Sequence, residues 1–209
     1  MIPLEFLDDL IRLKLIPRSG WISYRISKHD IESVAAHSYS VAAIALTVSE
    51  MIRLKNPKIH VEKIVRMALL HDLSESLTFD ISKAYLQYLG KRGPRLKTTL
   101  ERKAVSKILS GLQNEQLERN FKSSIEEYNA SQSIEARIVH SADAVDLLLQ
   151  ILEYQRMGYS KATLDPIWNE TKSKLLSNRL RFAKQWASML ERVRRGIGPK
   201  SRSTFAKRS

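Results

Sequence analysis

The sequence of 209 residues contains no cysteine. This absence excludes disulfide bonds, thiolate zinc sites and cysteine nucleophiles, so any bound metal must be held by His, Asp or Glu. Glycine and proline are also scarce, with seven and six residues. Because these helix breakers fall between long stretches of helix-forming residues, we expect an all-α fold.

Long apolar runs and a secretory signal are missing as well. The longest apolar runs, such as residues 41–48, are too short to cross a bilayer. Near the start of the chain, Glu5, Asp8 and Asp9 interrupt the stretch in which a signal peptide would have its apolar centre. The hydrophobic content of 43% and the charged content of 27% are typical of a soluble globular protein. We therefore expect a cytoplasmic protein with no membrane segment.

Positive charge is in excess, with a formal net charge of +13. About half of this excess lies in residues 192–209, which contain Lys and Arg but no acidic residue, together with Gly196, Gly198 and Pro199. This composition is typical of a flexible tail. We predict one domain over residues 1–195 and a basic tail over residues 196–209. The tail is interpreted either as a solvated end of the chain or as a weak contact to RNA or DNA.

Apolar residues at helical spacing predict where the helices lie. The first should begin near Pro3 and end before Pro17, and Ser33 is suited to cap the second. The remaining expected helices cover residues 33–54, 61–71, 80–89, 96–112, 134–156 and 164–194, the last with a kink near Pro166. We expect no β-strand, because no segment alternates between apolar and polar residues.

A few polar residues interrupt the apolar pattern of these helices. His71 and Asp72 follow two leucines, where a core-facing helix would ordinarily continue with aliphatic side chains. A carboxylate at such a position is costly unless it is paired or bound to a metal ion. Glu75 lies four residues after His71 and three after Asp72, so its carboxylate should face the same space.

The His-Asp dipeptide is weak evidence by itself, because His29-Asp30 is a second example in a polar segment that we interpret as a surface loop. His37 and Asp143 strengthen the argument, since each also lies on an apolar helical face. Taken alone, His37 is better explained as a hydrogen-bonded core histidine, and Asp143 equally well as part of a buried salt bridge. Their joint occurrence with His71-Asp72 favours a metal site.

Four short motifs occur in order along the chain: P-R-S-G-W at residues 17–21, E-S-V-A-A-H-S-Y at 32–39, H-D-L-S-E-S-L-T-F-D at 71–80 and S-A-D-A-V-D at 141–146. This ordered set resembles the HD superfamily, and more closely its 5′-deoxynucleotidase-like branch. The resemblance implies an all-α HD-domain helical bundle with a metal site in its core.

By that resemblance, the metal ligands are His37, His71, Asp72 and Asp143, and they would hold a single divalent ion. Two imidazoles and two carboxylates suit Mn, Co, Fe, Ni or Zn better than Mg or Ca. The resemblance further implies a homodimer.

The resemblance also assigns roles to residues outside the ligand set. Glu75 would be the acidic catalytic residue and Asp80 would lie near the attacking water, while Arg18 would bind the phosphate and Trp21 would lie against the nucleoside. The residues alone leave alternatives open: Arg18 as a solvated side chain, Trp21 as a loop aromatic packed on the core, and Asp80 as the cap of a short helix. An arginine does offer a planar fork that matches phosphate oxygens.

Two positions depart from the family pattern. Relatives usually carry an acid just before the first ligand histidine, where this chain has Ala36, and often a lysine three residues before the last ligand aspartate, where it has His140. Neither change removes a ligand, but both alter the surroundings of the predicted site.

Three functions are consistent with these residues. The first is hydrolysis of deoxynucleoside 5′-monophosphates to nucleoside and phosphate. The second keeps the metal site but acts on another phosphoester, such as a cyclic nucleotide, a nucleoside triphosphate or a nucleic-acid end. The third is a non-catalytic helical module that contacts nucleic acid, which Glu75 argues against because a purely structural metal site does not need that acid.

Overall fold

The structure is a computed structural model that describes residues 3–178 and 180–197, without the side chains of Lys83 and Ala84. Over these residues the chain forms α-helices and short 3₁₀ helices, and its only β-type pairing is the isolated bridge between Pro17 and Ser33. The all-α prediction is therefore confirmed. None of the helices described is long and apolar enough to cross a membrane.

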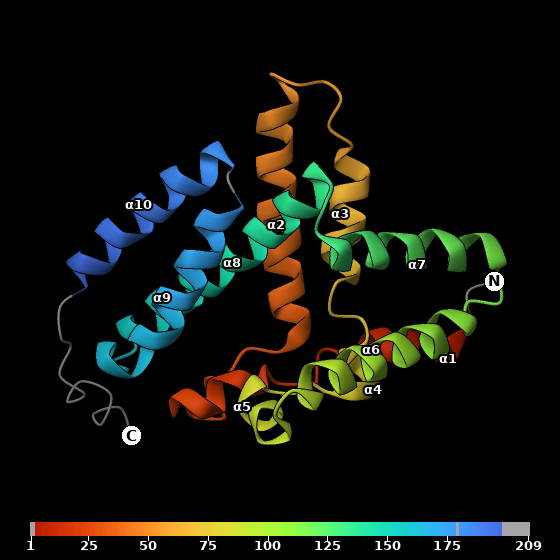
Figure 1. The fold of residues 1–209 in the computed structure, drawn as a ribbon, viewed down its shortest axis with the longest axis horizontal. Helices are drawn as coiled ribbons and strands as arrows, with labels where there is room; N and C mark the ends of the chain where they lie inside the picture. Colours follow the sequence, from red (N-terminus) through yellow and green to blue (C-terminus); the bar gives the residue numbers. More distant parts are fainter. Residues whose placement is uncertain (1–2, 179, 198–209) are drawn as a thin grey trace, which may run out of the picture. The chain divides into compact units, whose positions relative to one another are not determined.

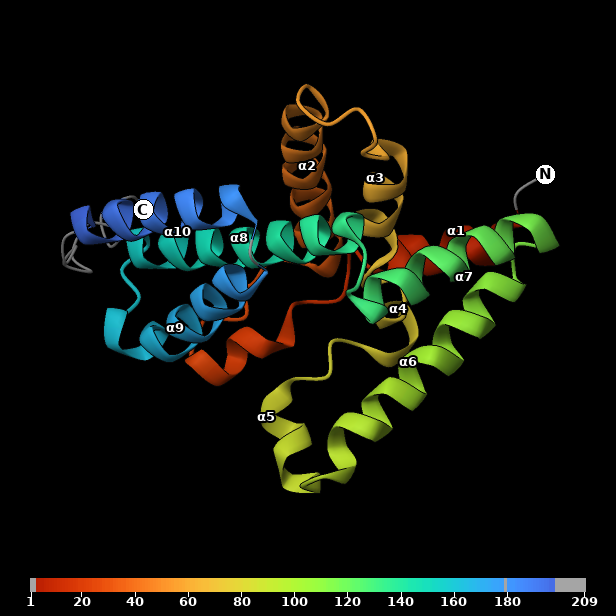
Figure 2. The ribbon, with the colours of Figure 1, turned by 45° about the horizontal axis from the view of Figure 1, so that its top comes forward.

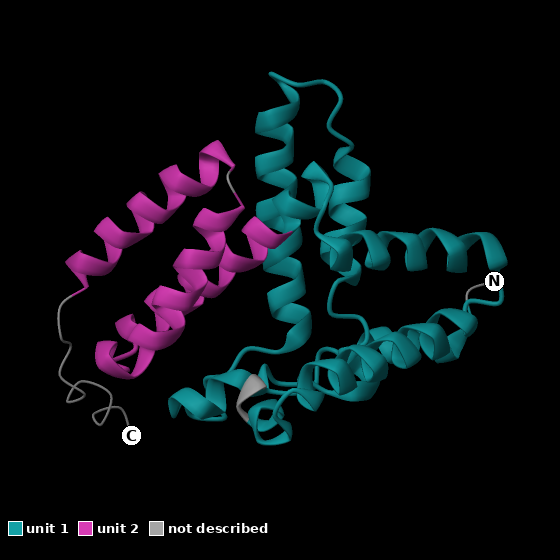
Figure 3. Cartoon of the chain, viewed as in Figure 1, with its two compact units in different colours: residues 1–139 teal, residues 140–209 magenta. Residues whose placement is uncertain are grey.

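The chain divides into two compact units, residues 1–139 and residues 140–209 (Figure 3). The first unit contains α1 (Leu4–Arg12), η1 (Ser19–Tyr24), α2 (Val34–Arg53), α3 (Val61–Leu70), α4 (Glu75–Thr78), α5 (Lys83–Leu86), η2 (Gln87–Leu89), α6 (Arg92–Ser110) and α7 (Glu115–Ala130). Helix α8 (Ile134–Arg156) begins in the first unit and continues into the second, which also contains α9 (Lys161–Ser177) and α10 (Arg181–Gly196).

Helices α2 and α3 lie side by side in the first unit (Figures 1 and 2). The predicted cap of α2 is confirmed, because the hydroxyl oxygen of Ser33 accepts a hydrogen bond from the backbone N–H of Ala36 at 3.2 Å. Helix α3 also packs against α7, and α7 packs against α6. The end of α3, where His71 and Asp72 follow, is therefore held by neighbours on more than one side.

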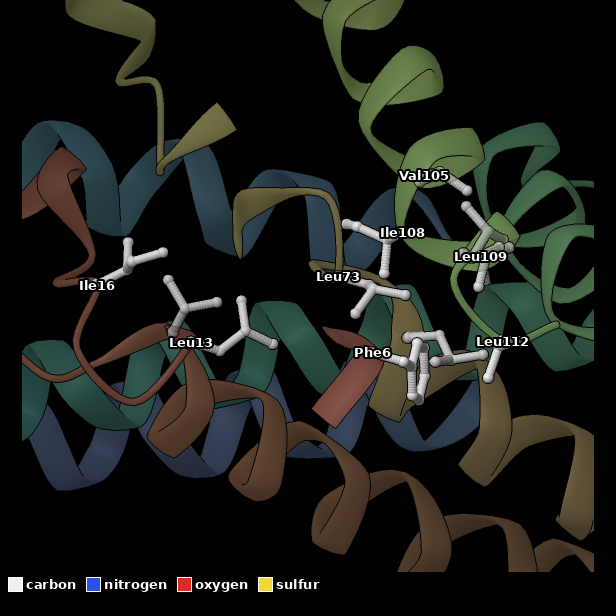
Figure 4. Close-up of a cluster of buried hydrophobic side chains, with 11 residues drawn as sticks. Phe6, Leu13, Ile16, Leu73, Val105, Ile108, Leu109 and Leu112 are labelled. Atoms are coloured by element: carbon white, nitrogen blue, oxygen red, sulfur yellow. The ribbon is translucent and has the colours of Figure 1, made fainter. Parts of the chain in front are cut away.

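A cluster of buried apolar side chains forms the core beneath these helices (Figure 4). Its members come from α1, the start of α2, the end of α3, α6, α7 and the segments that follow α1, α3 and α6: Phe6, Leu13, Ile16, Val34, Leu70, Leu73, Val105, Ile108, Leu109, Leu112 and Ile125. Burying one such side chain stabilises the fold by about 1.5–3 kcal/mol. Since Leu70 and Leu73 flank His71 and Asp72, the core fixes the backbone from which these two polar side chains project.

Helix α6 begins earlier than the predicted residue 96. It starts at Arg92, with Pro94 in its first turn, where a missing backbone N–H costs no intrahelical hydrogen bond. The neighbouring Gly93 permits a close approach, since a Cβ atom there would lie 2.2 Å from the carbonyl oxygen of Leu86. Gly93 and Pro94 therefore belong to the first turn of α6, and the glycine is needed for close packing.

The prediction of one helix over residues 164–194 is wrong. Helix α9 runs through Pro166 and ends at Ser177, and α10 begins at Arg181 after Leu180, whose backbone is extended. The side-chain amide of Asn178 donates a hydrogen bond to Ser141 Oγ at 3.0 Å, a tertiary bond made just past the end of α9. Periodicity does not reveal the break, because the buried residues on both sides keep steps of three and four: Leu164, Trp168, Thr171, Leu175, Ala183, Ala187, Leu190 and Arg194.

The predicted tail over residues 196–209 lies almost wholly outside the described residues. Helix α10 ends at Gly196 and the description ends at Ile197. The division into a domain over residues 1–195 and a basic tail stays a prediction.

Candidate metal centre

The site begins where α3 ends. His71 and Asp72 directly follow this helix, and one turn further on Glu75 begins α4. The turn between them is closed by a hydrogen bond from the backbone N–H of Glu75 to the carbonyl oxygen of Asp72 at 3.0 Å. All three side chains therefore leave a short, hydrogen-bonded stretch of backbone.

Three of the predicted ligands converge. The Nε2 atoms of His37 and His71 are 3.3 Å apart, and Oδ2 of Asp72 lies 3.2 Å from His71 Nε2 and 3.6 Å from His37 Nε2. His37 is completely buried on α2, and His71 is nearly so. The structure thus brings together residues separated by more than thirty positions along the chain.

A hydrogen bond sets the protonation of the His71 ring. Its Nδ1 lies 2.8 Å from the carbonyl oxygen of Ala68, and since a carbonyl can only accept, Nδ1 must carry the proton. In the neutral ring this leaves a lone pair on Nε2, the atom that faces His37 and Asp72. The ring of Tyr128 packs edge-on against the same imidazole, with centroids 5.4 Å apart, and restricts its rotation.

The donor set fits a divalent metal ion. His37, His71 and Asp72 each offer a ligand atom, and these atoms lie within 4.8 Å of one another. Two imidazole nitrogens and one carboxylate oxygen are the ligands that divalent transition metals prefer. Nearby, the buried Oε2 of Glu75 has no hydrogen-bond partner among the described residues, as expected of a group that meets a ligand or water.

Arg18 reaches the centre from the loop before α2. The backbone N–H of Arg18 donates to the carbonyl of Glu32 at 3.0 Å, and that of Val34 donates to Ile16 at 2.8 Å, which ties this loop to the start of α2. Arg18 Nη1 then donates to Asp72 Oδ2 at 2.9 Å. The side chain keeps 17% of its surface exposed, so it can meet a ligand while bound to Asp72.

The charges around Asp72 favour its ionised form. Burial alone would raise the pKa of this carboxyl, but in the metal-free protein the protonated forms of His71 and His37, a hydrogen bond from protonated His71 and the charge of Arg18 outweigh it. They hold the pKa of Asp72 well below its ordinary value of 3.8. A metal ligand must be deprotonated, and Asp72 meets this condition.

Glu75 has the opposite environment. Burial, together with the charges of Asp72 and Asp80, raises its pKa to about 9, and Arg18 and Lys97 only partly oppose this rise. Two carboxyls one helical turn apart are thus held at opposite extremes of protonation. Such a difference between neighbouring acids is typical of functional sites.

Asp80, which lies just after α4, is hydrogen-bonded to the loop that carries Arg18. Its carboxylate accepts a hydrogen bond from the backbone N–H of Gly20 at 3.3 Å, and its carbonyl accepts one from the hydroxyl of Ser19. The alternative in which Asp80 caps the next helix is wrong, because α5 begins only at Lys83. Asp80 therefore helps to position Arg18, and its predicted place near an attacking water stays a prediction.

For two of the predicted site residues, Trp21 and Asp143, a place in the site stays a prediction. Trp21 is only 2% exposed, and its Nε1 donates to Glu32 Oε1 at 3.4 Å. The predicted contact of its ring with a nucleoside stays a prediction. Asp143 lies half-buried on α8, in the part that belongs to the second unit. Its role as the fourth ligand likewise stays a prediction.

Three residues near the centre were missed by the sequence patterns. Lys97 and Glu101 of α6 form an ion pair at 3.4 Å, and Lys97 lowers the pKa of Glu75. Tyr128 of α7 contacts His71. All three belong to helices whose amphipathic pattern only predicts a packed helix, and no motif distinguishes them. Their nearness to the site follows from tertiary packing.

The chain is similar to known proteins over most of its length. Residues 10–181 match the HD domain family. The "5′-deoxynucleotidase HDDC2" of Bos taurus is 30% identical over 171 residues, which cover 82% of this chain and 77% of the relative. The "5′-deoxynucleotidase hdd1" of Schizosaccharomyces pombe is 30% identical over 158 residues, covering 72% and 71%. A solved structure of a conserved hypothetical protein from Pyrococcus furiosus has 29% identity and a TM-score of 0.70, covering 92% of this chain and 99% of that one.

Proposed function

The chain belongs to the HD domain family, and we propose that it is a metal-dependent phosphohydrolase that hydrolyses deoxynucleoside 5′-monophosphates to nucleoside and phosphate. The observation that carries this proposal is the convergence of His37, His71 and Asp72, with Arg18 bound to the same Asp72 oxygen. The relatives named 5′-deoxynucleotidase support the choice of substrate.

His37, His71 and Asp72 would hold the metal ion, with Asp143 as the proposed fourth ligand. The mixed imidazole and carboxylate set suits one ion of Co, Mn, Fe, Ni or Zn. When bound, such an ion acts as a Lewis acid toward a phosphoryl oxygen and makes a water molecule more acidic. The proton on His71 Nδ1 keeps the ring in the tautomer that this role needs.

Arg18 would bind the phosphate. One of its N–H groups is used by Asp72, and the planar guanidinium has further N–H groups that match phosphate oxygens. Because Asp72 and the backbone bonds of the loop fix this side chain, the phosphate would meet an arginine that is already oriented. Asp80 maintains this position through Ser19 and Gly20.

Glu75 would move a proton. Its Oε2 is buried and unpartnered among the described residues, one helical turn from Asp72, so it can exchange a proton with the attacking water or with the 5′-oxygen of the leaving nucleoside. The surrounding burial excludes bulk water from that exchange.

A substrate panel tests the proposal. The purified full-length protein is supplied with Co or Mn and incubated with deoxynucleoside and ribonucleoside 5′-monophosphates, cyclic nucleotides, nucleoside triphosphates and 5′-phosphorylated oligonucleotides. We expect phosphate release from the deoxynucleoside monophosphates with the highest kcat/KM. Release only from another class would replace the proposed substrate, and no release from any monophosphate would contradict the proposed function.

Three accompanying predictions concern the protein as a whole. We propose a cytoplasmic homodimer whose basic tail makes at most weak nucleic-acid contacts, on the basis of the resemblance and the charge of residues 192–209. Light scattering after size exclusion measures the oligomeric state. Nucleic-acid binding that disappears when residues 196–209 are deleted would assign the contact to the tail.

A further inference from the structure

Phe79 has an unusual backbone conformation at the end of α4. Its φ is 58° and its ψ is 168°, a combination adopted almost only by glycine. Ser131 and Arg25 also have positive φ, but with ψ of 20° and 28° they lie in the left-handed helical region, which costs an L-residue less. The Phe79 N–H donates to the carbonyl of Glu75 at 2.9 Å, so the strained residue closes the turn that begins at Glu75.

Burial does not explain a phenylalanine at this position. The residue is 64% exposed, so its ring gains little from the hydrophobic effect. A glycine would adopt the same backbone without strain and would remove apolar surface from solvent. Position 79 therefore carries an aromatic ring against both the backbone preference and the burial preference, which indicates a functional reason.

The position of Phe79 along the chain gives that reason. It lies four residues after Glu75 and directly before Asp80, whose backbone and side chain are bound to Ser19 and Gly20. The ring therefore projects from the short link between the proposed proton-exchanging carboxyl and the loop that holds Arg18. Trp21, an aromatic residue of that loop, is only 2% exposed, so Phe79 is the more accessible ring of these two.

We propose that the Phe79 ring stacks on the base of the substrate nucleotide and so makes the site prefer nucleotides to sugar phosphates without a base. The inference rests on the proposed function and adds a specificity-determining residue to it. Aromatic rings stack on all bases, and removing one such ring typically weakens binding about 5- to 150-fold.

Two substitutions distinguish the effect of the Phe79 ring from the effect of the backbone strain. Phe79→Gly removes both, and Phe79→Leu removes the ring but keeps the strain. For each protein, kcat/KM is measured with dAMP and with 2-deoxyribose 5-phosphate, and Tm is measured by calorimetry.

We expect the ratio of kcat/KM for dAMP to kcat/KM for 2-deoxyribose 5-phosphate to fall about 10-fold in both variants. We expect Tm to rise by about 2–4 °C in Phe79→Gly, since relief of strain exceeds the entropic cost of glycine, and to stay near the wild-type value in Phe79→Leu.

Two matched controls come from the same chain. Tyr88→Leu removes another ring, 84% exposed on η2, and Ser131→Gly relieves another positive φ at the end of α7. Both should leave the kcat/KM ratio unchanged. An unchanged ratio in both Phe79 variants, or an equal fall in Tyr88→Leu, would overturn the inference.

The failure of the inference can be distinguished from failure of the proposed function. If the wild type hydrolyses dAMP and the Phe79 variants keep its substrate ratio, only the role of Phe79 is wrong. If the wild type hydrolyses neither compound, the proposed function is wrong, and calorimetric titration of both compounds then decides the role of Phe79. If the wild type and Phe79→Gly bind dAMP with equal affinity, the inference is overturned. If Phe79→Gly loses affinity for dAMP but not for 2-deoxyribose 5-phosphate, the inference is supported.

Discussion

Each unit of the molecule pairs an arginine with an acidic side chain, but the two clusters differ in how completely their polar groups are satisfied. In the second unit, Arg194 Nη2 lies 2.6 Å from Asp165 Oδ1, and its Cζ lies 4.4 Å from the centroid of the Trp168 ring. In the first unit, Arg18 donates to Asp72 at 2.9 Å beside two histidines.

The difference lies in the groups around each pair. The Trp168 N–H donates to Glu191, which also binds Lys172 at 2.8 Å, so the second-unit cluster consists of complementary donors and acceptors. In the first unit two ring nitrogens face each other at 3.3 Å, and Oε2 of Glu75 is buried without a hydrogen-bond partner among the described residues. A saturated cluster stabilises a fold, whereas an unsaturated one retains affinity for a ligand.

Removing a predicted ligand should have the largest effect. We expect His71→Ala to lose the bound metal and about 10³-fold or more in kcat, because the ion supplies several kcal/mol of transition-state stabilisation. Elemental analysis and the phosphate-release assay measure the two losses. His29→Ala, which changes the exposed histidine of the other His-Asp pair, is the matched control and should retain both. Full activity of His71→Ala would contradict the assignment.

Glu75→Gln should separate proton transfer from metal binding. The amide keeps the shape of the side chain but cannot exchange a proton, so kcat should fall about 10²- to 10⁴-fold. The metal content should stay at the wild-type level, because Glu75 is not a proposed ligand. A parallel loss of metal would show instead that Glu75 holds the ion.

Arg194→Met should affect stability and leave the chemistry unchanged. Loss of the ion pair with Asp165 and of the contact with Trp168 should lower the free energy of unfolding by about 2 kcal/mol. Denaturant titration measures this change, and kcat per folded molecule should remain at the wild-type value. Arg195→Met is the control, since that side chain is 78% exposed and should change stability by less than about 0.5 kcal/mol. A loss of kcat in Arg194→Met would contradict the distinction between a stabilising cluster in the second unit and a ligand-binding cluster in the first.

The smallest expected effect is the pH dependence of the second-unit cluster. A hydrogen bond from Lys172 outweighs burial and, with Trp168, holds the pKa of Glu191 below its ordinary value of 4.5. A lowered pKa in the folded state means that stability from this group is present above about pH 4.5 and is lost as pH falls through the folded value. We expect Glu191→Gln to remove up to about 1 kcal/mol of the stability difference between pH 6 and pH 3. An identical pH slope in both proteins would contradict this assignment.

Much of the fold could be predicted from the spacing of apolar residues, and its failures have local causes. The sequence indicates helices around residues 33–54, 61–71 and 134–156, which the structure confirms as α2, α3 and α8. It misses the break between α9 and α10, because the helical spacing of buried residues continues on both sides of the break. The hydrogen bond that Asn178 makes at this break is a tertiary contact, which residue spacing does not reveal. It also places the start of α6 too late, because Gly93 serves packing against Leu86.

For the site, the sequence by itself determines which side chains can do the chemistry. The absence of cysteine restricts the ligands to His, Asp and Glu, and the His71-Asp72 pair with Glu75 one turn later favours a metal and acid centre only together with His37 and Asp143. Only the tertiary structure decides that His37 meets His71 and that Arg18 binds Asp72. It also decides that Trp21 is buried while Phe79 is exposed on a strained backbone. Local spacing determines the face on which a side chain lies, but what that face meets depends on packing between distant segments.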